Sequence, residues 1–193
     1  MLIHGFEMQF SNKQVLIVED QRPFLLLLKG LMHSMGASDV VTKSSAEQAV
    51  SLCKKHKFDI VICDLHLGAD NKNGYELIEE LRTRRLISPT SVFILISADS
   101  ARPVVLGSIE RRPDDFLIKP FSQVQLKSRI VRAWQKRQFL QQAFSLVEHG
   151  EINSAIDHII IEIVLNNPIS KKERGSGKSS SLVDTPKPIN KIL

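Results

Sequence analysis

The sequence predicts an open α/β fold, in which helices cover both faces of a parallel five-stranded sheet. Short β-branched runs alternate with longer amphipathic stretches over residues 1–120, which is the pattern of parallel strands joined by crossover helices. Four of these runs end on residues that can do chemistry, at Glu19 with Asp20, at Asp64, at Ser97 and at Lys119. Because parallel strands end at one edge of such a sheet, we expect these residues to share a site.

The alternation gives each element a place along the chain. We expect strands at 14–18, 39–42, 59–63, 92–96 and 115–118, and helices at 23–35, 45–56, 74–86 and 102–111. Ser44 or Ser45 with Gln48 resembles a capping box. Gly36 suits the end of the first helix, and Pro103 suits the first turn of the fourth.

A helical segment is expected after the last strand. From Ser122, apolar residues recur at spacings of three and four as far as Val147, and Gly150 interrupts them. A second apolar helix is expected from Ile152 to Leu165, followed by a polar, basic composition that is typical of disorder. We therefore divide the chain into a lead-in (1–12), an α/β domain (13–138), a helical extension (139–168) and a disordered basic tail (169–193).

Charge and composition argue against a DNA-binding domain and against a membrane protein. The formal net charge is +5, and most of it comes from residues 171–193, where six lysines or arginines accompany two acids, so we expect no DNA-reading face on the domain. No apolar stretch approaches the roughly 18 residues of a membrane span, and the N-terminus lacks a signal-peptide pattern. We expect a cytoplasmic protein with no membrane partner.

Cys53 and Cys63 are expected to be buried free thiols.

The residue types at the strand ends suggest a specific chemistry. Three converging carboxylates, from Glu19, Asp20 and Asp64, repel one another unless a cation joins them. Hard oxygen ligands suit Mg²⁺, or Mn²⁺ in its place, and Mg²⁺ favours a phosphate partner. Lys119 and the hydroxyl of Ser97 could then contact a phosphoryl group carried on one carboxylate.

Residues 13–138 resemble the response-regulator receiver domain of two-component signalling. The resemblance implies that Asp64 is the phosphoacceptor, Glu19 and Asp20 hold the metal, Ser97 is the switch hydroxyl and Lys119 pairs with the phosphoryl group. It also implies a flavodoxin-like doubly wound (βα)5 fold with strand order 2-1-3-4-5, and a cis peptide before Pro120. Such a protein catalyses only its own phosphorylation and dephosphorylation, so we do not expect an enzyme in the usual sense.

The chain departs from the family pattern after the acceptor and at the switch. Gly68 stands where a proline is usual, and the loop before Gly74 is longer. The resemblance assigns the backbone carbonyl of His66 to the metal, and the side chains of His66 and Asp99 to tuning the phosphoryl lifetime. Phe116 occupies the position of the aromatic switch residue and lacks the hydroxyl of tyrosine.

The resemblance implies a histidine kinase or a phosphotransfer protein as donor. We expect output by protein–protein interaction, through the face formed by the 102–111 helix, the 115–118 strand and the next helix, or through the C-terminal helices. Residues 139–168 resemble a tetratricopeptide repeat, whose apolar face needs a cover such as a second copy in a homodimer, the receiver domain or further repeats. Two alternatives stay open: a scaffold or kinase inhibitor that works without phosphorylation, and a transcription regulator whose DNA reader lies in the tail or has been lost.

Overall fold

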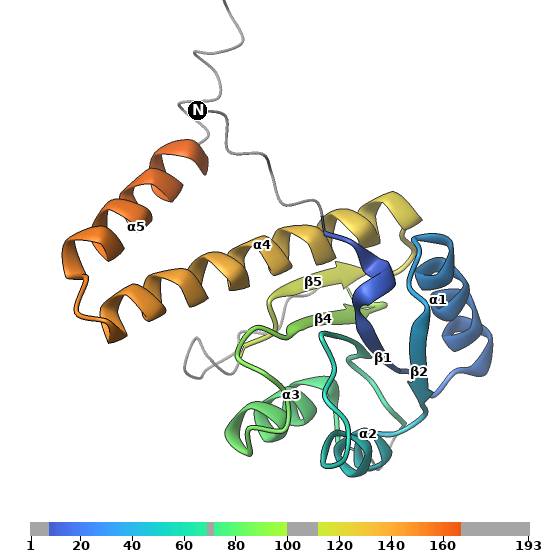
Figure 1. The fold of residues 1–193 in the computed structure, drawn as a ribbon. Helices are drawn as coiled ribbons and strands as arrows, with labels where there is room; N and C mark the ends of the chain where they lie inside the picture. Colours follow the sequence, from blue (N-terminus) through green and yellow to red (C-terminus); the bar gives the residue numbers. More distant parts are fainter. Residues whose placement is uncertain (1–7, 69–71, 100–111, 167–193) are drawn as a thin grey trace, which may run out of the picture. The chain divides into compact units, whose positions relative to one another are not determined.

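The computed structural model describes residues 8–68, 72–99 and 112–166, and it contains one five-stranded parallel sheet (Figure 1). The sheet order is β2-β1-β3-β4-β5, which confirms the predicted fold class. The strands are β1 (Gln14–Val18), β2 (Asp39–Lys43), β3 (Ile60–Asp64), β4 (Val92–Ser97) and β5 (Asp115–Ile118).

Helices cover both faces of the sheet. They are α1 (Arg22–Ser34), α2 (Ala46–Cys53), α3 (Gly74–Thr83), α4 (Gln123–Glu148) and α5 (Ile152–Asn166), and a short 3₁₀ helix, η1 (Phe10–Asn12), precedes β1. α1 and the first half of α4 pack on one face, and α2 and α3 on the other (Figure 1). The helix expected at 102–111, with Pro103, lies outside the described residues.

Alternating residues of each central strand build two cores, because successive side chains point to opposite faces. Ile17, Ile62 and Ile94 pack with residues of α1 and α4. Val18, Cys63 and Leu95 pack with residues of α2 and α3. Both faces of β3 and β4 are therefore buried, which explains why their sequences are continuous apolar runs.

Residues before β1 belong to the first core. Met8 and Phe10 are buried there together with Ala133 of α4. The predicted lead-in (1–12) therefore contributes side chains to the first core from residue 8 onward.

Two helices end earlier than the sequence pattern suggests. α3 ends at Thr83, and Arg85 then adopts a left-handed φ of 52°. Leu86 still packs against the second core after the chain has left the helix, so the apolar periodicity continues past the helix end. α2 similarly ends at Cys53 rather than near His56.

The predicted caps of α1 and α2 are present. The Ser45 hydroxyl accepts a hydrogen bond from the backbone N–H of Gln48 at 3.3 Å, which satisfies one of the unpaired donors at the start of α2. Gly36 follows α1 with a φ of 98°, a conformation that costs glycine little.

The chain forms two compact units, Met1–Gln142 and Ala143–Leu193. In the second unit, Gly150 has a φ of 77° and separates the end of α4 from α5. Ala143 and Ala155 are buried, whereas several large apolar side chains are exposed, namely Phe144, Val147, Ile152, Ile156, Ile159 and Ile160. The tetratricopeptide-like character of these helices stays a prediction.

None of the described helices combines the length and the apolar character that a membrane crossing requires.

Candidate functional site

The predicted site residues lie at the carboxyl ends of four adjacent strands. Glu19 and Asp20 follow β1, Asp64 ends β3, Ser97 ends β4 and Lys119 follows β5. The strand register aligns these residues across the sheet. Asp64 pairs with Ile96, which precedes Ser97, and Ser97 pairs with Ile118, which precedes Lys119. Residues separated by up to 100 positions in sequence are thus placed at one edge of the sheet.

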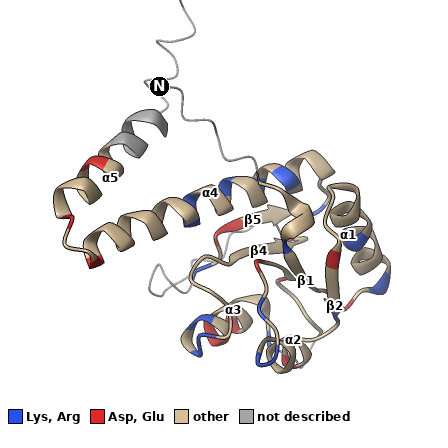
Figure 2. Ribbon diagram, in the orientation of Figure 1, with Lys and Arg blue, Asp and Glu red and all other residues tan. Residues whose placement is uncertain are grey.

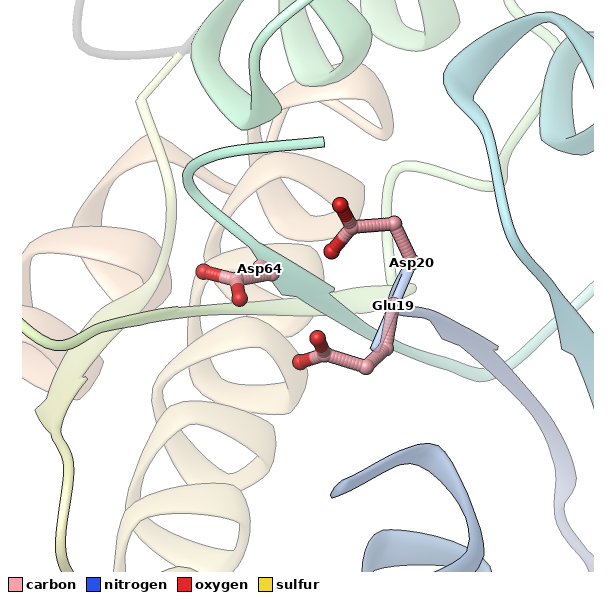
Figure 3. A group of neighbouring side chains, drawn as sticks. All are labelled: Glu19, Asp20 and Asp64. Carbon is pink, nitrogen blue, oxygen red and sulfur yellow. The ribbon is translucent and has the colours of Figure 1, made fainter. Parts of the chain in front are cut away.

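Three carboxylates form the centre of the site. Glu19, Asp20 and Asp64 each offer a carboxylate oxygen, and these atoms lie within 4.8 Å of one another (Figure 3). Glu19 and Asp64 are buried, whereas Asp20 is exposed and leaves the cluster open to solvent. The carboxylates thus converge on one shared space.

Lys119 supplies the positive charge opposite two of these acids. Its Nζ donates to Oδ2 of Asp64 at 2.5 Å and to Oε2 of Glu19 at 3.0 Å. Burial lowers the pKa of Lys119, but its hydrogen bonds to Asp64 and Glu19 outweigh that effect, and the pKa is raised. The ammonium therefore stays protonated and holds the two carboxylates together.

Burial also changes the titration of Glu19. Burial, assisted by the nearby charge of Asp64, raises its pKa to about 7, although Lys119 opposes the shift. Its Oε1 also accepts the backbone N–H of Gln21 at 3.1 Å. Three carboxylates around one ammonium leave an excess of negative charge, so the donor set fits a hard divalent cation.

Ser97 is fully buried beside Lys119. Its Oγ accepts the backbone N–H of Asp99 at 2.9 Å, and its carbonyl accepts the backbone N–H of Lys119 at 2.7 Å. An oxygen that accepts one hydrogen bond can still donate its own hydrogen, so Ser97 could donate to an anion held at Asp64.

The other predicted residues follow β3, β4 or β5 or, for Phe116, lie within β5. The backbone N–H of His66 approaches Oδ1 of Asp64 at 3.4 Å, and the His66 side chain is exposed. Asp99 is also exposed, and Phe116 is half-buried against the second core. The peptide bond between Lys119 and Pro120 is cis.

Gly74 allows α3 to begin close to the end of β3. A Cβ at this position would stand 2.7 Å from the carbonyl oxygen of Asp64 and would also overlap Leu95. The Gly74 N–H donates to the carbonyl of Leu65 at 2.9 Å. Just before it, Asn73 caps α3 in a reciprocal capping box with Glu76.

One site residue was not foreseen from the sequence. The ring of Phe24, in the first turn of α1, lies under the Lys119 ammonium, with Nζ 3.9 Å from the ring centroid. Phe121 packs edge-on against this ring, at 5.8 Å between centroids and 88° between planes. The only sequence signal was an aromatic residue shortly after the acidic pair, which core packing explains equally well.

Three arginines of α4 pair with two acids at the start of β5. Figure 2 marks lysines and arginines along α4 and acids at the start of β5. Arg129 and Arg132 pair with Asp115, and Arg137 pairs with Asp114. These arginines anchor α4 to β5.

Comparison with known proteins identifies the family and agrees with the observed fold. The family profile of the response regulator receiver domain matches residues 15–131. The chain is 30% identical over 145 residues to the alkaline phosphatase synthesis transcriptional regulatory protein PhoP of Bacillus subtilis, and the match covers 75% of this chain and 58% of that protein. It is 31% identical over 125 residues to the chemotaxis protein CheY of Thermotoga maritima, covering 65% of this chain and 97% of CheY.

The chain spans between 32% and 58% of the length of three transcriptional regulators that it matches. Among solved structures, it is similar to the receiver domain of a sensor histidine kinase from Pseudomonas aeruginosa PAO1, with a TM-score of 0.52 and 24% identity over 63% of this chain and 96% of that one. In that protein a magnesium ion is coordinated in the active-site cleft.

Proposed function

Because the chain belongs to the response regulator receiver domain family, we propose that it accepts a phosphoryl group on Asp64 and signals by a change in protein–protein interaction. One observation carries the proposal: the Lys119 ammonium bridges Asp64 and Glu19 beside an acid cluster open to solvent. An isolated acid cluster would need only a cation. The added lysine and the Ser97 hydroxyl supply donors for the oxygens of a transferred phosphoryl group.

In the proposed transfer, a carboxylate oxygen of Asp64 attacks phosphorus. A new P–O bond forms as the P–N bond of a phosphohistidine breaks, and the leaving imidazole keeps the electron pair and takes up a proton. Lys119 then exchanges its hydrogen bond with Asp64 Oδ2 for one with a phosphoryl oxygen. Hydrolysis returns Asp64 to its carboxylate, and we expect no reaction on any other substrate.

A divalent cation completes the proposed site. Glu19, Asp20, Asp64 and the backbone carbonyl of His66 would hold Mg²⁺, or Mn²⁺ in its place. When bound, the cation neutralises charge on the phosphoryl oxygens. A solved receiver domain from Pseudomonas aeruginosa carries magnesium in its active-site cleft, which supports this assignment.

The donor is proposed to be a histidine kinase or a phosphotransfer protein. Leu26 and Leu27 are exposed on α1, the helix that starts shortly after Asp20. Exposed leucines in the helix that follows the acidic pair suit a protein donor better than a small molecule, because they offer apolar area for docking.

The output is proposed to pass through two regions. Ser97 would move toward the phosphoryl oxygens, Phe116 would follow it inward, and the surface at β5 and α4 would change. The exposed apolar side chains of the second unit offer another surface for a partner, which we expect to be a protein and could be a second copy of this chain.

The test uses the full chain with Mg²⁺ and acetyl phosphate, followed by mass measurement. We expect wild type to gain one phosphoryl group and Asp64→Asn to gain none. Beryllofluoride should raise Mg²⁺ affinity and alter the oligomeric state of wild type only. A wild-type protein that gains no phosphoryl group and ignores beryllofluoride would refute the proposal.

A scaffold that works without phosphorylation is the second candidate, because the apolar side chains of the second unit are exposed in the structure as it stands. Asp64→Ala separates the two. Equal partner binding by wild type and Asp64→Ala, with and without acetyl phosphate, would favour the scaffold.

A further inference from the structure

Lys119 has an aromatic neighbour that the proposed mechanism does not use. Two of the donors on Nζ are directed to Asp64 and Glu19, and the ring of Phe24 lies 3.9 Å from the same nitrogen. A cation above a ring face is attracted by the ring quadrupole, and the attraction grows as the cation loses water. The Lys119 side chain is only 15% exposed, so little water competes here.

The ring is itself held in place. Phe24 and Phe121 are half-buried and pack against the first core, and they meet edge to face. This geometry is the favourable one for two aromatic rings. Phe121 lies two residues after Lys119 in the sequence, so the lysine and the aromatic partner of Phe24 come from the same short segment.

We propose that Phe24 is a positioning residue of the phosphoacceptor site, whose ring face holds the Lys119 ammonium where it can pass from the Asp64 carboxylate to a transferred phosphoryl group. The inference rests on the proposed function. The carboxylates of Asp64 and Glu19 hold Lys119 by hydrogen bonds, and once a phosphoryl group occupies Asp64, the Asp64 hydrogen bond is lost. The ring is an uncharged partner that remains through this exchange, so it limits the positions that the flexible lysine side chain can adopt.

The test compares Phe24→Leu with Phe24→Trp in the full chain, using acetyl phosphate and Mg²⁺. Leucine keeps the apolar cover but has no ring face. We expect Phe24→Leu to lower the phosphorylation rate constant by about five- to thirty-fold, and Phe24→Trp to stay within about threefold of wild type. Rescue by tryptophan would distinguish the ring from simple packing.

Trp134→Leu is the matched control. In wild type, the Trp134 ring packs on the same core and lies 5.9 Å from Nζ of Lys13. Lys13 precedes β1, so this contact is at the opposite end of the sheet from Asp64. We expect this variant to be phosphorylated at the wild-type rate.

A second measurement needs no phosphoryl group. Protons above a ring face are shielded, so the Lys119 ε-methylene protons should resonate upfield in wild type and return downfield in Phe24→Leu. If Phe24→Leu is phosphorylated at the wild-type rate, the inference is wrong and the proposed function stands. A wild-type protein that is never phosphorylated would overturn both.

Discussion

Arg137 of α4 donates through Nε to Oδ1 of Asp114 at 2.6 Å, which ties α4 to the residue before β5. The other oxygen of Asp114 accepts the backbone N–H of Phe93 at 2.8 Å and lies 3.4 Å from Arg82 of α3. One acid with a side chain only 4% exposed therefore joins both faces of the sheet.

We expect Asp114→Ala to lower the free energy of unfolding by about 3 kcal/mol, because two largely buried guanidinium groups lose their counter-charge. Urea denaturation measures this. Asp115→Ala is the control: its partners Arg129 and Arg132 are 34% and 65% exposed and can be hydrated, so we expect a loss of about 1 kcal/mol or less. Equal losses in the two variants would contradict this account.

Gly74→Ala should damage both the fold and the site. The new Cβ would press on the Asp64 carbonyl and on Leu95, so we expect a loss of about 1–3 kcal/mol and slower phosphorylation. Gly30→Ala is the matched control, since nothing lies near its Cβ position in α1. That variant should gain roughly 0.5–1 kcal/mol, as alanine favours helix. Thermal unfolding and acetyl phosphate kinetics test both, and an unperturbed Gly74→Ala would be the contrary result.

Magnesium affinity should depend on pH through Glu19. Burial raises the pKa of Glu19 from 4.5 to about 7, so below pH 7 a proton competes with the cation. We expect the apparent Mg²⁺ affinity to rise by up to about tenfold per pH unit toward pH 7 and then to level off. Titrations at pH 6, 7 and 8 measure it, and Glu19→Gln should bind more weakly with little pH dependence. An affinity that stays constant over this range in wild type would speak against the role of Glu19.

The same shift affects stability in the absence of metal. The folded state holds the Glu19 proton more tightly than the unfolded state does, because its pKa is raised. Stability is therefore highest below pH 4.5 as far as this group is concerned, and it falls as pH rises from 4.5 to about 7. Denaturation of wild type and Glu19→Gln across this range isolates the contribution, since the glutamine variant lacks the titration.

Phe116→Tyr should strengthen the response to phosphorylation. Phe116 is half-buried, and without a hydroxyl its outward position has no hydrogen bond to stabilise it. A tyrosine hydroxyl would stabilise one position over the other and enlarge the difference between the two states. The measurement is the ratio of partner affinity, or of self-association, with and without beryllofluoride. If Phe116→Tyr leaves this ratio unchanged, the proposed role of the missing hydroxyl is wrong.

The clustering of the strand-end residues was predictable from sequence, because the carboxyl ends of parallel strands lie at one edge of the sheet. All five strands run parallel, so the residues that follow β1, β3, β4 and β5 lie at the same edge of the sheet. The order 2-1-3-4-5 followed from the family resemblance and is confirmed. The roles assigned to Ser97, His66 and Asp99 stay predictions.

Phe24 and Asp114 could not be predicted, for two different reasons. An aromatic residue in an amphipathic helix is explained by core packing, and its contact with Lys119 joins α1 to the residue that follows β5. Asp114 lies in a charged stretch that resembles an exposed loop, and its burial depends on arginines contributed by α3 and α4. Both contacts join segments distant in sequence, which local patterns do not encode.

The reactivity of the two cysteines reports transient opening of the second core, to which both belong. Cys53 and Cys63 are both buried, and burial raises the pKa of Cys53 to about 11 and that of Cys63 far above its usual range. Only a transient opening of the second core can expose their thiolates to an alkylating reagent. Cys63 adjoins Asp64, so any ligand that tightens the acceptor strand will slow its labelling. Thiol labelling can therefore time site occupancy in the unmodified chain, without an added probe.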